Sequence, residues 1–384
     1  MSARIFRTSP KFWYSLIVAC LLWSALAVAD ASATLYQYRP GGPALFDSKL
    51  SPMTLFQRAL SDALIACDQN GIAADGQFGP GSRKAIQRLS SCAGWEDTAW
   101  SPDNPLHGTV DTKLWRRVLP GTPFPDAGTR AFGLVLALER TDYNRVEWNY
   151  GTGDDRSALT WGPFGATAGH GNEIRAILER LIATAPGLVD QAFGREAAFV
   201  RRFITAPGNQ GYALLKPEYG DSARKHLWTQ ALEHLGALPE GRAAYDWYAF
   251  VSGKWFTAGL KRLKSLVTRR AVTEIDHAFF LDLAVHASIK RSRIDESRTA
   301  IEAETARRGR ALTPAEMRQA IGSAFAARVN PRWRNDRLGR NVVFYVDGVG
   351  ITALSGKERT VWRHRSGYRA SYYGLSDKRS TVYP

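Results

Sequence analysis

The sequence predicts a mainly α protein made of two folded units, of which the second contains a small β-sheet. Apolar residues recur at helical spacing through residues 52–120 and 127–327. A Pro-rich joint at 120–125 separates these stretches, and a Gly-rich segment at 149–171 carries turn and strand signals. The 384 residues are enough for two or three domains, and 45% of them are hydrophobic and 23% charged. These values exclude wholesale disorder and a polytopic membrane protein, and 3 cysteines are too few for a disulfide scaffold.

The N-terminus has the anatomy of a secretory signal. Three basic residues precede an apolar stretch at 12–29, and small residues at 31–33 offer a cleavage site of the A-x-A type. We therefore expect residues 1–33 to be a signal peptide and the mature protein to be periplasmic or secreted. Two alternatives stay open, because the stretch is long enough for an uncleaved membrane anchor and residues 17–20 loosely fit a lipoprotein cleavage box. Only an uncleaved anchor would make a membrane a partner.

The charge and the cysteines extend this expectation. The formal net charge is +15, and loss of residues 1–33, with three basic residues and one acidic residue, would leave +13. Such a chain attracts polyanions, whether nucleic acid, anionic lipid or an acidic polymer.

The mature chain would keep Cys67 and Cys92, and in an oxidising compartment an isolated pair in one small domain favours a disulfide over two buried free thiols.

The first folded unit is expected at residues 52–120, after a linker at 34–51 that is rich in Pro, Gly and Ser. Helical spacing of apolar residues at 54–66 is followed by a run of turn residues at 74–82, and a third apolar helical face spans 111–119. The unit therefore predicts a small helical domain.

Two motifs in this unit resemble a known family. The turn Asp-Gly-x-Phe-Gly-Pro at 75–80 and the segment Gly-Thr-Val-Asp-Thr-Lys-Leu-Trp at 108–115 are similar to the three-helix peptidoglycan-binding domain of many bacterial wall hydrolases. The resemblance implies peptidoglycan as a partner and Asp75 and Phe78 as substrate-binding residues. It departs from the family at 92–107, where an insertion replaces a short connection. The alternative interpretation is that the turn only separates two helices.

The second unit is predicted to be helical around one small β element. The Gly-rich stretch at 149–171 falls between the first two of its helices. We expect helices at residues 131–141, 171–185, 190–204, 222–238, 241–252, 256–267, 274–288 and 313–327.

Glu139 is the first candidate catalytic residue. It follows the stretch Ala-Phe-Gly-Leu-Val-Leu-Ala-Leu at 131–138, which is apolar on every side and therefore predicts a buried central helix. A carboxyl group at the end of such a helix is costly to ionise and can keep its proton near neutral pH. That property suits a general acid, which protonates the departing oxygen in glycoside hydrolysis.

Glycoside hydrolysis needs a second carboxylate, as base or as nucleophile. Asp154 and Asp155 lie in the predicted β element, and Thr160 follows them with a hydroxyl that could position a water molecule. Glu147, on the connecting segment, is a third acidic candidate. The alternative is that these carboxylates are ordinary turn formers exposed to solvent.

This constellation resembles the lysozyme-like superfamily, in which a Glu ends the first long helix and a small sheet supplies an Asp and a Thr. The spacing from Asp155 to Thr160 is similar to that of chitosanases, whereas the spacing from Asp154 to Thr160 is closer to phage-type lysozymes. The interval from Glu139 to either Asp matches neither family closely. The resemblance implies an α+β domain at 127–355.

Other segments take part in the same resemblance. Residues 278–286 look like the helix that packs behind the cleft of these enzymes, and Arg337 and Arg340, followed by Asp-Gly-Val-Gly at 347–350, are similar to the closing segment of the family. We take Trp161, Thr167 and His170 as substrate-binding residues around the sheet. The alternative for His170, which lies between two glycines, is a structural turn residue.

The remaining C-terminal residues, 356–384, are expected to form a basic, Tyr-rich tail that is solvated and partly disordered. Residues 331–384 hold 11 Lys or Arg against 4 Asp or Glu, with aromatic residues interleaved. Such a pattern can bind single-stranded nucleic acid, but it suits sugar rings and anionic wall polymers equally well. An exported chain seldom meets nucleic acid, so we expect none as a partner.

The two resemblances together imply hydrolysis of a wall glycan. No pair of the seven histidines has the His-x-x-x-His spacing of a zinc site, and no phosphate-binding or dinucleotide-binding glycine motif occurs, so we expect no metal and no cofactor. We expect a monomeric, exported hydrolase of the peptidoglycan glycan strand. The alternatives are a chitosanase-like glycosidase and a non-catalytic wall-binding or scaffold protein with a degenerate lysozyme-like domain.

Overall fold

The computed structural model is mainly α with short antiparallel sheets, which confirms the predicted fold class. It describes residues 34–37, 45–46, 52–95, 109–148, 157–169, 172–208, 210–216, 221–268, 270–286, 289–364 and 367–380. The predicted signal peptide lies outside these residues. In the described part of the chain no helix is both long and apolar enough to cross a membrane.

The N-terminal module is built on three helices, α2 (Pro52–Ile65), α3 (Pro80–Cys92) and α4 (Thr112–Val118). Phe56 of α2 stacks on Trp115 of α4 with ring centroids 5.8 Å apart, and both side chains are buried. The predicted linker at 34–51 contributes two strands to this module. Strand β1 (Thr34–Gln37) pairs with β4 (Thr109–Asp111), and β2 (Leu45–Phe46) pairs with β3 (Gln77–Phe78).

The turn before α3 is held by one buried glutamine. The Gln57 amide donates to Asp75 Oδ1 and to the Gln77 carbonyl, each at 3.0 Å, and its Oε1 accepts from the Gly76 N–H at 2.9 Å. Asp75 is exposed but uses its carboxylate in this turn. Phe78 has 0% of its surface exposed. The expectation that Phe78 contacts substrate is therefore wrong, because its ring belongs to the core of the module.

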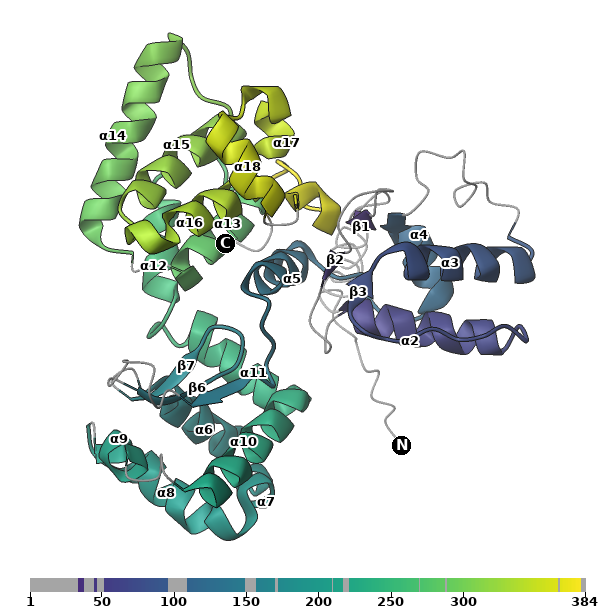
Figure 1. Ribbon diagram of the computed structural model, residues 1–384, viewed down its shortest axis with the longest axis vertical. Coiled ribbons are helices and arrows are strands. Elements are labelled where there is room, and N and C mark those ends of the chain that lie inside the picture. Colours follow the sequence, from purple (N-terminus) through teal and green to yellow (C-terminus); the bar gives the residue numbers. More distant parts are fainter. Residues whose placement is uncertain are drawn as a thin grey trace, which may run out of the picture.

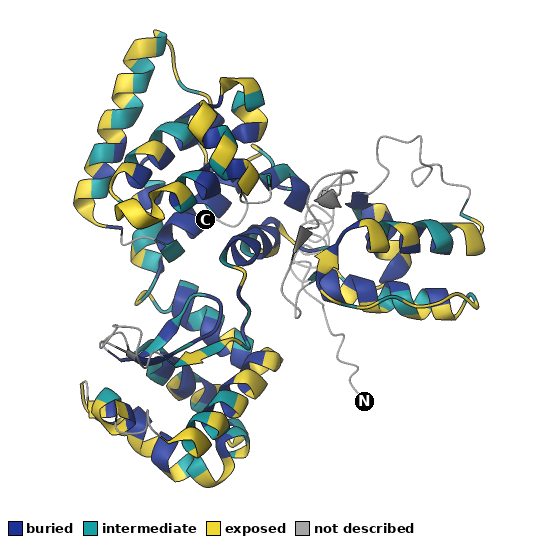
Figure 2. Cartoon of the chain, in the orientation of Figure 1, coloured by how far each residue is buried: buried dark blue, intermediate teal, exposed yellow. Residues whose placement is uncertain are grey.

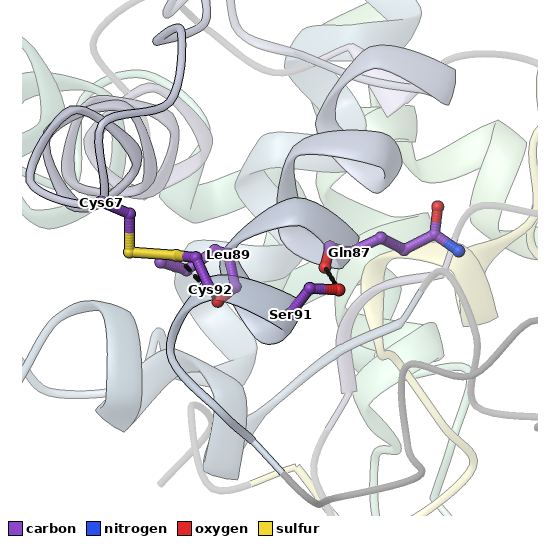
Figure 3. Close-up of a disulfide and its surroundings, with 5 residues drawn as sticks. All are labelled: Cys67, Gln87, Leu89, Ser91 and Cys92. Carbon is purple, nitrogen blue, oxygen red and sulfur yellow. Dashed lines mark hydrogen bonds between the residues drawn. A yellow bond between two sulfur atoms is a disulfide. The ribbon is translucent and has the colours of Figure 1, made fainter.

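The structure joins Cys67 and Cys92 in a disulfide (Figure 3). Their Cα atoms lie 6.2 Å apart, and the bond ties the chain just after α2 to the last residue of α3. A covalent link across the far end of a three-helix module limits its unfolded ensemble, which suits a domain with a small core.

The rest of the chain forms two lobes around helix α5 (Ala127–Glu139), as Figure 1 shows. In the described residues, the sheet lobe contains a three-stranded antiparallel sheet in the order β5-β6-β7 and six α-helices. Its elements are β5 (Val146–Trp148), β6 (Ser157–Trp161), β7 (Ala166–Gly169), α6 (Glu173–Thr184), α7 (Leu188–Phe193), α8 (Ala197–Thr205), α9 (Gln210–Leu215), α10 (Ser222–Ala237) and α11 (Pro239–Asp246).

The helical lobe follows a π-helical turn at Trp247–Val251. Its elements are α12 (Thr257–Lys264), α13 (Glu274–His286), α14 (Arg291–Arg308), α15 (Pro314–Ala327), α16 (Pro331–Val343), α17 (Val346–Val349) and α18 (Gly356–His364). The sequence reasoning had assigned no helix to α14 or α16. Only Ile294 and Ser297 of α14 are buried, so that this helix has no apolar stripe to reveal it.

Helix α5 is shared between the cores of the two lobes. Leu134 and Leu138 belong to the hydrophobic core that also contains the helical lobe and the N-terminal module, whereas Leu136 belongs to the core of the sheet lobe. Figure 2 shows α5 as mostly buried along its length. A helix that is apolar on every side can serve two cores at once, as the sequence predicts for a central helix.

The C-terminal segment is packed rather than solvated, so the expected disordered tail is wrong for residues 356–364 and 367–380. Trp362, Tyr372 and Tyr373 are buried, and the Trp362 indole N–H donates to the Tyr368 carbonyl at 2.7 Å. Buried Arg318 of α15 donates to Asp377 at 2.8 Å. Trp362, Tyr368, Tyr372 and Tyr373 thus belong to the core of the helical lobe.

A partly buried carboxyl group of the sheet lobe contacts the segment that follows α5. Asp246, at the end of α11, accepts a hydrogen bond from the Tyr143 hydroxyl at 2.5 Å. Burial raises the pKa of Asp246 to about 6, although the Tyr143 hydrogen bond and the charge of Arg242 act in the opposite direction. Asp246 therefore keeps its proton in the folded protein at a pH where the unfolded chain releases it.

We expect Asp246→Asn to stabilise the protein at neutral pH. The ordinary Asp pKa is about 3.9, so the cost of ionising the buried group develops between about pH 4 and pH 6 and is complete above that. The substitution should therefore raise the free energy of unfolding by ~2 to 3 kcal/mol at pH 7.5 and by much less at pH 4. Chemical denaturation at both pH values measures this, with the exposed Asp62→Asn as control. A gain that is equal at both pH values would contradict the assignment.

Candidate active site

The candidate active site is centred on Glu139, the last residue of α5. The helix starts at Asp126, whose side chain accepts a hydrogen bond from the Thr129 N–H at 2.7 Å, and it ends because Arg140 adopts a left-handed conformation with φ of 54°. The Glu139 side chain is 20% exposed, although the helix before it is almost entirely buried. The carboxyl group thus reaches solvent at the point where the chain passes from one lobe to the other.

Arg340 of α16 holds this carboxyl group in place. Its Nη2 donates to Glu139 Oε1 at 2.6 Å, and the guanidinium is only 1% exposed. Among the described residues, Oε1 is the Glu139 oxygen with a hydrogen-bond partner, which leaves Oε2 for a ligand. Charge-assisted contacts of this kind restrict the rotamer of a carboxylate and fix its direction.

Arg340 is itself fixed by a buried ion cluster. Asp282 of α13 lies between Arg340 and Arg337 and accepts hydrogen bonds from both, from Arg340 Nε at 3.1 Å. Arg337 Nε also donates to Asn341 Oδ1 at 2.9 Å, and the Asn341 amide donates to the Gly322 carbonyl at 2.7 Å. Asp282, Arg337 and Arg340 are at most 1% exposed. Three helices of the helical lobe thus cooperate to aim one arginine at Glu139.

The electrostatics of the cluster follow from its composition. Burial on its own would raise the pKa of Asp282, but the charges and hydrogen bonds of Arg337 and Arg340 hold this pKa far below its usual range. Two guanidinium groups and one carboxylate leave one positive charge in excess, and this charge faces Glu139. An ion pair with a buried arginine is a feature that the expectation of a purely apolar helix end did not include.

The sheet presents polar side chains on one face. In the strand register Glu147 of β5 lies opposite Thr160 of β6, and Thr160 lies opposite Thr167 of β7, so the three share a face. Glu147 is exposed and accepts from Arg145 Nε at 3.1 Å. Thr167 donates through its hydroxyl and its backbone N–H, the latter at 3.0 Å, to Glu173 in the first turn of α6.

The segment after Glu139 is hydrogen-bonded to this sheet. The Thr141 hydroxyl donates to the Pro163 carbonyl at 2.8 Å, and the Gly162 N–H donates to the Arg145 carbonyl at 2.8 Å. Both partners belong to the end of β6 and the turn that follows it. The helix end that carries Glu139 is therefore tied directly to the hairpin that carries Thr160 and Thr167.

The sequence-predicted residues have different outcomes. Asp154, Asp155 and His170 lie outside the described residues. Trp161 is only 1% exposed, and its indole N–H donates to the Tyr143 carbonyl at 2.8 Å. The expectation that Trp161 binds substrate is therefore wrong, because strand alternation places it on the core face, opposite to Thr160.

Sequence reasoning missed two acidic residues near the candidate site, Asp282 and Glu173. Asp282 stands within the apolar run Phe-Phe-Leu-Asp-Leu-Ala of α13, and a lone charge in such a run signals a buried ion pair. Arg337 and Arg340 had been noted only for their resemblance to a closing segment. Glu173 carried no signal beyond its position near a helix start. Among the described residues, no group of three or more His, Cys, Asp or Glu is placed to hold a metal ion.

Comparisons with known proteins give a distant structural similarity. No protein-family profile and no curated protein matches the chain. A mutant chitosanase from Bacillus subtilis MY002 complexed with 6 GlcN matches with 18% identity and a TM-score of 0.39, over 61% of this chain and 94% of the other. The native chitosanase from the same source matches with 16% identity and a TM-score of 0.39, over 67% of this chain and all of the other.

We expect Asp282→Asn to be strongly destabilising. The change leaves buried Arg337 without its counter-charge and Arg340 with Glu139 alone, and breaking such a buried pair costs about 3 to 5 kcal/mol. Chemical denaturation at neutral pH measures the loss. The control is Asp295→Asn, which removes an exposed pair with Arg298 and should cost under about 1 kcal/mol. Equal effects of the two substitutions would show that the cluster does not support the lobe.

Proposed function

We propose that the protein is an exported glycoside hydrolase that cleaves the glycan strand of peptidoglycan, with Glu139 as the general acid. The observation that carries the proposal is the placement of Glu139, a partly exposed carboxyl group at the end of a buried helix, held by Arg340 from one side. A carboxyl group that is fixed in direction and partly exposed suits proton transfer to a glycosidic oxygen.

The proposed reaction needs two carboxyl groups. Glu139 gives its proton to the glycosidic oxygen while the bond from that oxygen to the anomeric carbon breaks, and a second carboxylate activates water or attacks the carbon directly. Asp155 or Asp154 stays the proposed second carboxylate. Thr160, on the open face of the sheet, stays the proposed water-positioning residue.

Three features support peptidoglycan as the substrate. The N-terminal module carries the turn and the Gly-x-Val-Asp segment that resemble wall-binding domains. The proposed mature charge of +13 attracts a polymer that bears peptide carboxylates. The cysteine pair suits the oxidising cell envelope. A chitosanase-like activity is the second candidate, favoured by the spacing from Asp155 to Thr160.

Glu139→Gln should abolish release of reducing sugar from purified sacculi. The amide keeps the size of the side chain and its contact with Arg340 but has no acidic proton to give to the leaving oxygen. Loss of a general acid lowers the rate about 10²- to 10⁴-fold. The control is Glu233→Gln on the exposed face of α10, which should act as wild type. Equal release by Glu139→Gln and wild type would refute the catalytic assignment. Binding to sacculi without release by any variant would instead support a non-catalytic wall-binding protein.

The response to salt should separate the two substrates. Attraction between a basic enzyme and peptidoglycan weakens as salt shortens the Debye length from ~10 Å at 0.1 M to ~3 Å at 1 M. Turnover of sacculi should therefore fall with added salt. Turnover of chitosan, a polycation that the enzyme repels, should be slow and should rise with salt. Faster turnover of chitosan at low salt would favour the second candidate.

A further inference from the structure

Trp333 is an exposed aromatic residue on the helix that positions Glu139. It lies in the first turn of α16 and is 50% exposed, whereas every other exposed large hydrophobic residue in the described part of the chain is aliphatic. Exposing half of an indole to water is unfavourable, and tryptophan is enriched where a ligand or partner covers it. Single exposed apolar residues are common, so exposure alone would carry nothing.

The position of Trp333 on α16 relates this exposed side chain to the candidate site at Glu139. Arg337 and Arg340 follow it by four and seven residues, and helix periodicity places these three side chains on one face. Arg340 on this face contacts Glu139. Seven residues correspond to ~10 Å along the helix axis, so Trp333 lies about two turns from the residue that holds the proposed acid.

Contacts with α13 show which way this face points. Asp282 of α13 binds Arg340, and His286, one turn later, lies 3.7 Å from Asp336 of α16. Moving along α16 from Arg340 toward Trp333 therefore follows α13 to its C-terminal end. In Figure 1, α12 and α16 lie on the side of the helical lobe nearest the sheet lobe. The first turn of α16 therefore lies toward the C-terminal end of α13, beyond the buried Arg337 and Arg340.

The residues next to Trp333 define the chemistry of its ligand. Arg332 lies over the indole with its guanidinium carbon 4.8 Å from the ring centroid, and the tryptophan as a whole stays 50% exposed. Arg332 and Arg334 are both exposed. An apolar ring flanked by two cations matches a polymer that combines flat sugar faces with carboxylates, and it disfavours a polycationic glycan.

We infer that Trp333 forms a sugar-binding subsite for the acidic glycan strand whose cleavage is proposed at Glu139. A pyranose ring stacks its C–H face on the exposed part of the indole, while Arg332 and Arg334 attract the carboxylates that the strand carries. The subsite holds sugars remote from the scissile bond, so it contributes mainly to binding of long strands. The inference rests on the proposed function for the identity of the ligand.

Binding in the inactive Glu139→Gln background tests the subsite independently of catalysis. The probe is a size-fractionated series of uncross-linked glycan strands from sacculi, measured by calorimetry. Trp333→Ala should weaken binding of long strands ~5- to 30-fold, and the loss should shrink as the strands shorten. Trp333→Phe, which keeps a ring, should restore most of the affinity. The control is Val251→Ala, which removes part of a side chain that is 68% exposed.

Turnover by the otherwise wild-type enzyme adds a second readout. Trp333→Ala should raise KM for long strands with little change in kcat, because a remote subsite binds substrate and transition state alike. Long-strand affinity of Trp333→Ala equal to that of Val251→Ala would overturn the inference even if the enzyme is active. Absence of turnover by wild type, together with the expected loss of binding in Trp333→Ala, would refute the proposed hydrolase and leave the sugar subsite in place.

Discussion

The structure depends on one buried carboxylate, Asp282, between two buried arginines. Hydrophobic packing alone would allow α13 and α16 to slide or rotate with small energetic changes, but a charge cluster without access to water tolerates few geometries. Because Arg337 and Arg340 must both reach Asp282, the register between the two helices is set. Glu139 gains its orientation from this register, so that the stability of the lobe and the geometry of the site have the same origin.

Helix α5 connects the ion cluster at Asp282 to both hydrophobic cores of the molecule. It carries Glu139 at one end, and its first residues adjoin the Pro-rich joint with the N-terminal module. Its side chains enter both hydrophobic cores. Arg130, near its start, is buried and pairs with Glu274 at the start of α13, at 3.4 Å. The two helices are therefore joined by ion pairs near both ends, directly at one and through Arg340 at the other.

Sequence reasoning succeeded where the signal is local. An unbroken apolar run predicts a central helix that ends at Glu139, and turn residues predict the break before α3. It failed where the cause is distant: Glu139 and Arg340 are 201 residues apart, and nothing near either one indicates the other. Trp161 shows a second limit, because a strand places neighbouring residues on opposite faces and composition does not say which face is buried. Helix α14 shows a third limit, because its charged side chains form ion pairs and the sequence there has no periodic apolar residues that would predict a helix.

The packed C-terminal segment fastens the end of α13 that lies opposite the Asp282 cluster. Ser376 donates to Glu274 through its hydroxyl and its backbone N–H, both at 3.0 Å, and Asp377 binds Arg318 at 2.8 Å. Arg130 and Asp276 also pair with these two buried residues, so the segment completes ion pairs that the rest of the lobe begins. A chain truncated before Ser376 would keep the Asp282 cluster and lose the contacts that fasten the other end of the same helix.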